Sequence, residues 1–73
     1  MKAVGAPYSQ QLIRELEQAQ YMTEMAVLRV PTSPLRSQLT EANILLIGCL
    51  TAAKRLNNGE DKEVVFNEEL RND

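Results

Sequence analysis

Two runs of small and aliphatic residues, spaced alternately by four and three positions, dominate the hydrophobic pattern of this 73-residue chain. A 4-3 spacing keeps one side of an α-helix facing one partner helix over several turns. The first run comprises Leu12, Leu16, Ala19, Thr23, Ala26 and Val30. The second run comprises Leu35, Leu39, Ala42, Leu46, Cys49, Ala53 and Leu56. The pattern predicts two long helices that pack against each other along these 4-3 runs.

The segment between the two runs carries signals for a break between helices. Pro31 ends the first helix, because a proline inside a helix removes a hydrogen bond and clashes with the preceding turn. Thr32 or Ser33 can cap the second helix, and Pro34 then occupies its first position, where a missing N–H costs nothing. The chain is therefore predicted to fold back on itself as an antiparallel helical hairpin.

We predict a single all-α domain over residues 1–73. Its expected parts are an N-terminal arm at 1–8, a helix at 9–29, a loop at 30–33, a helix at 34–57 and an acidic tail or short helix at 58–73. The sequence leaves the tail open: Lys62–Phe66 could form a strand, or Val65, Phe66 and Leu70 could form one side of a short helix. We favour a short helix or an ordered tail that packs on a neighbouring subunit.

Both helices also carry apolar residues outside the 4-3 runs: Tyr21, Met25, Leu28, Ile44 and Ile47. The middle of the second helix, residues 42–50, is apolar nearly all round, and such a helix is buried on every side. The first helix covers only one side, so we expect a second subunit on the other. Gly48 could permit a close backbone approach there. The alternative is a monomeric core with the acidic tail folded across it.

The small size of the chain favours self-association. A chain of this length buries only roughly 60% of the surface that it exposes when unfolded. With one cysteine and no histidine, it cannot form an intramolecular disulfide or a usual zinc site. We therefore expect no metal or cofactor, and hairpins that associate into a helical bundle. Cys49 is expected to be a small core residue in a reducing, cytoplasmic compartment.

Charge and hydropathy narrow the possible partners. Residues 1–56 hold six basic and four acidic side chains, whereas residues 57–73 hold two basic and six acidic ones. This acidic tail and the lack of a dense basic stripe argue against general DNA binding. The longest apolar stretch, Ile44–Leu50, is too short to span a bilayer. The N-terminus lacks the apolar core of a signal peptide. We expect a soluble protein without a membrane partner.

The sequence offers little for catalysis and somewhat more for anion binding. No histidine is present to act as a general base, and no glycine-rich loop could cradle a phosphate, so the chain is not expected to be an enzyme. The start of the second helix presents free N–H groups that attract phosphates, and an exposed tyrosine can stack on a base. The candidate ligand-binding residues are Tyr8, Thr32, Ser33, Arg36, Lys54 and Arg55.

The stretch from Pro31 to Ala42, PTSPLRSQLTEA, and the later Ala52-Ala53-Lys54-Arg55 resemble the second helix of the phage anti-CBASS cyclic-nucleotide sponges. The chain lacks the central tryptophan and the Glu-Glu-Ala step of that helix. The resemblance implies a small helical hairpin that assembles as a hexamer and sequesters signalling cyclic oligonucleotides. It also implies a tyrosine that stacks on a base, which Tyr8 matches, and basic residues that bind phosphates.

The expected function is non-catalytic binding by a small homo-oligomer. The favoured form is a protein-interaction module or inhibitor that uses the apolar residues outside the 4-3 runs. The alternative is a sponge that binds cyclic oligonucleotides at subunit junctions, in the host cytoplasm if the protein is phage-encoded.

Overall fold

The computed structural model describes residues 7–70, and this part of the chain contains three α-helices and no strand. Helix α1 spans Gln10–Arg29, α2 spans Pro34–Asn57 and α3 spans Lys62–Glu69. The predicted all-α class is confirmed, and the tail forms a helix, not a strand. Most of the arm predicted at residues 1–8, and the last three residues of the tail, lie outside the described residues.

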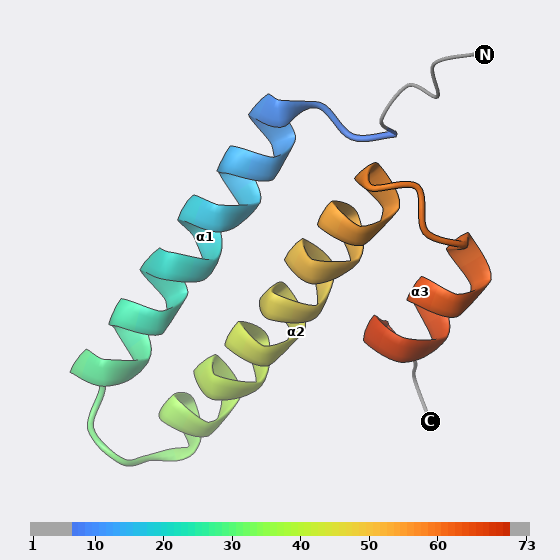
Figure 1. Cartoon of the computed structure of the whole chain (residues 1–73). Helices are drawn as coiled ribbons and strands as arrows, with labels where there is room; N and C mark the ends of the chain where they lie inside the picture. Colours follow the sequence, from blue (N-terminus) through green and yellow to red (C-terminus); the bar gives the residue numbers. More distant parts are fainter. Residues whose placement is uncertain (1–6, 71–73) are drawn as a thin grey trace, which may run out of the picture.

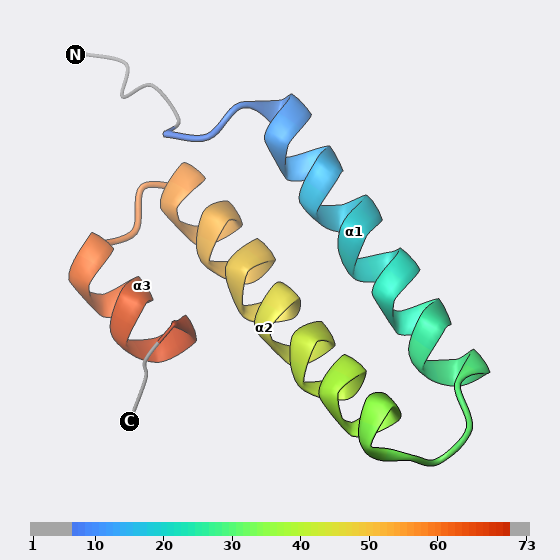
Figure 2. The same cartoon turned by 180° about the vertical axis from the view of Figure 1, so that it is seen from behind.

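Helix α2 lies in the middle of a single layer of helices (Figures 1 and 2). Helices α1 and α3 pack against opposite sides of α2 and, over residues 7–70, do not contact each other. The Cα atoms extend over 53 × 29 × 10 Å, so the third dimension is much smaller than the other two. The molecule is therefore flat, and neither broad face of the layer is covered by another element of the described chain.

The local signals in the sequence account for the ends of the two long helices. The Ser9 hydroxyl caps α1 by accepting a hydrogen bond from the Leu12 N–H at 3.1 Å. The Ser33 hydroxyl caps α2 in the same way, through the Arg36 N–H at 3.3 Å. Past the end of α2 the chain turns at Gly59, whose φ of 88° lies in the left-handed region that glycine tolerates best.

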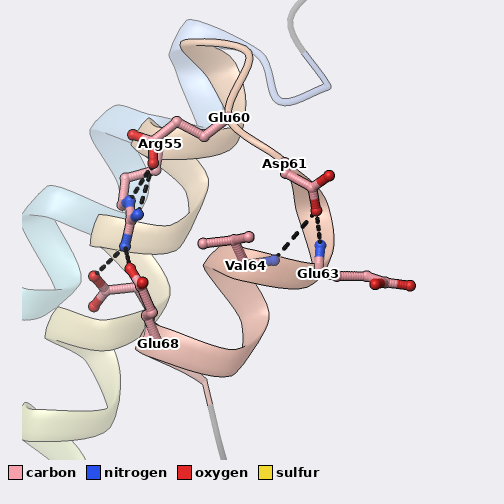
Figure 3. Close-up of polar contacts among 7 residues, drawn as sticks. Arg55, Glu60, Asp61, Glu63, Val64 and Glu68 are labelled. Carbon is pink, nitrogen blue, oxygen red and sulfur yellow. Dashed lines mark hydrogen bonds and ion pairs between the residues drawn. The ribbon is translucent and has the colours of Figure 1, made fainter.

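Helix α3 depends on packing against α2, because a helix of eight residues is not stable alone. Its first turn is capped by the Asp61 carboxylate, which accepts hydrogen bonds from the N–H groups of Glu63 and Val64 (Figure 3). Val65 is fully buried, and Ala52 on α2 is only 2% exposed. The tail thus forms the short helix that was one of our two expectations, and it packs on α2 of its own chain.

The glycine in the middle of α2 is where the end of α3 comes closest. A Cβ atom added to Gly48 would lie 2.9 Å from the carbonyl oxygen of Glu69, closer than such atoms approach in proteins. The close approach expected at Gly48 is therefore made by α3 of the same chain. A second subunit is not needed to explain the glycine.

The contact between α1 and α2 is rotated relative to the predicted one. Gln20 and Asn43 face each other across it, with a hydrogen bond of 3.2 Å between their side chains. The expectation that Cys49 is a core residue is wrong, since Cys49 is exposed. The 4-3 run of each helix is turned partly away from the other helix, toward one open face of the layer. Periodicity defines such a run but not the angle at which the neighbour meets it.

We expect Val65→Ala to release α3 while leaving α1 and α2 folded, because it removes the one fully buried side chain of α3. The loss should be about 2 kcal/mol of docking free energy. Amide hydrogen exchange of residues 62–69 measures it. Val64→Ala is the matched control, since Val64 is 45% exposed. Equal acceleration of exchange in the two variants would contradict this account of α3.

Candidate functional site

An apolar groove crosses all three helices on one face of the layer. Its volume is about 190 Å³, and no charged residue lines it. The lining residues are Tyr8, Leu12, Leu16, Cys49, Ala52, Ala53, Leu56, Phe66 and Leu70. Phe66 and Leu70 remain 38% and 41% exposed, whereas Val65 of the same helix is fully buried. Helix α3 therefore uses Val65 to dock and leaves two larger apolar side chains open to this groove.

The segment before α1 is fastened to the end of α2 by a pair of hydrogen bonds. The Tyr8 N–H donates to Asn57 Oδ1, and Asn57 Nδ2 donates to the Tyr8 carbonyl, both at 3.0 Å. The asparagine side chain thus replaces the backbone partner that Tyr8 would have in a strand. From the sequence, Asn57 was expected only as the last residue of the second helix. The partners are 49 positions apart, and no local pattern connects them.

A second, polar pocket of about 400 Å³ lies between the same ends of α1 and α2. Its size falls within the usual range for small-molecule sites. Its lining residues are Gln10, Ile13, Arg14, Glu17, Lys54, Asn57 and Asn58. The Lys54 ammonium forms an exposed ion pair with Glu17 at 2.9 Å. Arg14 adds a second cation, so the pocket carries a net positive charge and several amide groups.

The fold places the candidate ligand-binding residues at the two opposite ends of the α1–α2 pair. Tyr8 and Lys54 lie at one end of the α1–α2 pair, whereas Ser33 and Arg36 lie at the other (Figure 1). The Ser33 hydroxyl is also engaged: it donates to the Pro31 carbonyl at 2.9 Å and accepts from the Arg36 N–H. One chain alone therefore does not bring these residues together.

Arg55 is engaged by three carboxylates (Figure 3). Its guanidinium lies 2.6 Å from Glu60, 2.8 Å from Glu68 and 2.9 Å from Glu69. These hydrogen bonds raise the pKa of Arg55, chiefly through Glu60, and the same bond lowers the pKa of Glu60. A phosphate that approached Arg55 would meet this excess of negative charge. In the single chain, Arg55 instead connects α2 to α3 through these ion pairs.

The apolar residues outside the 4-3 runs stay open in the single chain. Tyr21, Leu28 and Ile44 are 60%, 65% and 60% exposed, and Ile47 is 44% exposed. Met25 is half-buried and borders a further pocket at the loop end of α1. Helix α3 is too short to cover Ile44 and Ile47 on α2. These side chains are thus available to another molecule.

Comparison with known proteins yields no match to a family model, to a curated protein or to a solved structure. No helix within residues 7–70 is both long enough and apolar enough to cross a bilayer. The same residues contain no group of three potential metal ligands. The features of the described chain that bear on function are therefore its pockets and its open apolar side chains.

We expect acid to weaken the attachment of α3. Because hydrogen bonding from Arg55 lowers the pKa of Glu60 below its usual value of 4.5, this pair stabilises the fold at neutral pH. That contribution is lost as the pH falls through the lowered pKa. Hydrogen exchange of α3 should accelerate relative to α2 between about pH 5 and pH 3. Glu60→Gln should flatten this dependence, and an unchanged profile in that variant would refute the assignment.

Proposed function

We propose that this protein is a non-catalytic binding module that works as a self-associated bundle of helical hairpins. The observation that supports the proposal best is the open apolar surface of the single layer. Within residues 7–70, the fully buried core consists of Ala52, Ala53 and Val65. The radius of gyration is 14.6 Å, against about 11 Å for a compact domain of this length. Such a thin structure gains stability from a partner that covers it.

The partner-binding surface in this proposal consists of the apolar residues outside the 4-3 runs, Tyr21, Met25, Leu28, Ile44 and Ile47. Tyrosine and methionine are enriched at protein interfaces, because both bury a large area and methionine adapts to irregular surfaces. A protein that offers a complementary apolar helix or groove would cover them. The module needs no catalytic group, since occupying the partner's surface is itself the activity.

A photo-crosslinking residue placed at Leu28 tests this surface in the cells that produce the protein. We expect it to capture a defined protein, because Leu28 is 65% exposed and lies within the proposed interface. The same residue placed at Gln11, an exposed polar position at the far end of α1, is the control. Light scattering should show a multiple of the 8.2 kDa chain mass. Capture at both positions alike, or a monomer at all concentrations, would contradict the proposal.

A second candidate function is the sequestration of cyclic oligonucleotides, as the resemblance to the sponge proteins implies. The supporting observation is the polar pocket of about 400 Å³, which is lined by Arg14 and Lys54. It lies next to the segment before α1, where Tyr8 is hydrogen-bonded to Asn57. In this proposal, Thr32, Ser33 and Arg36 of another subunit complete the site at a junction. Arg55 contributes only if it is released from its three carboxylates.

Thermal-shift measurements with a panel of cyclic di- and trinucleotides test the sponge. A ligand present at about 100 times its Kd should stabilise the fold by about 2.7 kcal/mol. Lys54→Gln should abolish the shift, because it removes a cation from the pocket. Lys62→Gln is the matched control, since Lys62 lies at the start of α3, outside the pocket. The absence of any shift across the panel, or equal shifts in both variants, would exclude this function.

A further inference from the structure

Over most of their length, the 4-3 runs of the two long helices alternate between covered and exposed positions; Ala26 and Leu56, near their ends, are both half-buried. On α2, Leu39, Leu46 and Ala53 are buried or half-buried, whereas the intervening residues are exposed; these are Leu35, Ala42 and Cys49. On α1, Leu16 and Thr23 are half-buried, whereas Leu12 and Ala19 are exposed. Between Leu12 and Thr23 on α1, and between Leu35 and Ala53 on α2, every second member of the run is therefore left open by the α1–α2 contact.

This alternation is the geometry of half a four-helix bundle. In such a bundle both apolar positions of each repeat are buried, because the run points at the bundle axis, between two neighbouring helices. Here each long helix has one neighbour along its run, which covers one of the two positions. One exposed position from each helix, Leu12 on α1 and Cys49 on α2, lies toward the same face, since both line the apolar groove.

No charged residue lines the groove on that face. The exposed members of the runs are leucine, alanine and cysteine, and Phe66 and Leu70 of α3 extend the same apolar groove. The polar pocket between α1 and α2, by contrast, contains the Glu17–Lys54 ion pair. Depletion of charge at the centre of a surface marks the core of a stable protein interface. This face is therefore suited to permanent burial.

We propose that a second copy of the chain packs on this face, so that two α1–α2 pairs form a four-helix bundle around a two-fold axis. The inference rests on the proposed self-association and names the surface that forms it. A copy presents the same 4-3 runs, and a two-fold interface requires a surface that is complementary to itself. The small side chains of Ala19 and Ala42 allow the facing helices to approach closely.

The layer is large enough to hold an interface of standard size. Such an interface buries about 800 Å² on each partner, which is about half of the rectangle that encloses the layer, 53 × 29 Å. The assignment also separates the two apolar surfaces. The 4-3 face holds the copies together, which leaves Tyr21 and Leu28 free for a different protein.

A pair of adjacent substitutions tests the assignment. Ala19→Glu places a charge on the proposed interface, whereas Gln18→Glu places the same charge on the neighbouring exposed position of α1. Glutamate is a good helix former, so neither change should disrupt α1, and circular dichroism checks this. By light scattering we expect Ala19→Glu to be a monomer of 8.2 kDa and Gln18→Glu to associate like the unmodified chain.

The single cysteine provides an independent measurement on the unmodified protein. Cys49 is exposed in one chain and lies in the groove that a second copy would cover. Its reaction with a thiol reagent should therefore slow roughly tenfold when nine chains in ten are assembled, because only free chains react. Dilution should restore the rate, and Ala19→Glu should react at the fast rate at every concentration.

The outcomes separate this inference from the proposal on which it rests. If the unmodified chain is a monomer at all concentrations, self-association fails and so does the assignment of the face. If it associates but Cys49 stays fully reactive, or if Ala19→Glu associates normally, self-association stands and this face is the wrong one. Slow reaction of Cys49 together with a monomeric Ala19→Glu supports both.

Discussion

The structure is governed by the fact that α2 has neighbours on only two opposite sides. A helix whose centre is apolar nearly all round requires cover in every direction, and α1 and α3 supply it in one plane. The resulting layer is about one helix thick, and its closest packing involves small side chains, Ala52 and Ala53. Because two helices on either side of a third cannot form an enclosed core, both broad faces of the layer stay open.

Two kinds of interaction hold the third helix, and they differ in what they contribute. Ion pairs near the protein surface contribute little to stability, so the carboxylates around Arg55 are weak as a source of stability. Burial of Val65 and the contact over Gly48 contribute most of the attachment. The charges instead fix direction: Arg55 draws Glu60 and Glu69 to one point, which sets both ends of α3 relative to α2.

The sequence was sufficient to predict the class of fold and the positions of the long helices, because caps and prolines act locally. Ser33 and Pro34 together mark the start of α2 without reference to the rest of the chain. The rotation of the helices was not predictable, since a 4-3 run defines a stripe about 100° wide and leaves its angle free. For this reason Cys49, which does belong to the 4-3 run, was wrongly expected to be a core residue.

The candidate site was predicted less well than the fold, because its contacts connect distant parts of the chain. Tyr8 was recognised as a candidate, but its partner Asn57 was not. Arg55 was identified as a cation that could bind phosphate, whereas its acidic partners on α3 became evident only from the docking of that helix. The same distance effect explains why Gly48 was assigned to the wrong neighbour.

Gly48 also has a consequence for the evolution of the chain. A glycine inside a helix costs about 1 kcal/mol relative to alanine, a loss that is justified only while the Glu69 carbonyl rests against it. In a related chain without the third helix, α2 would be more stable with alanine at this position. The residue at position 48 therefore indicates whether a related chain has retained its C-terminal helix.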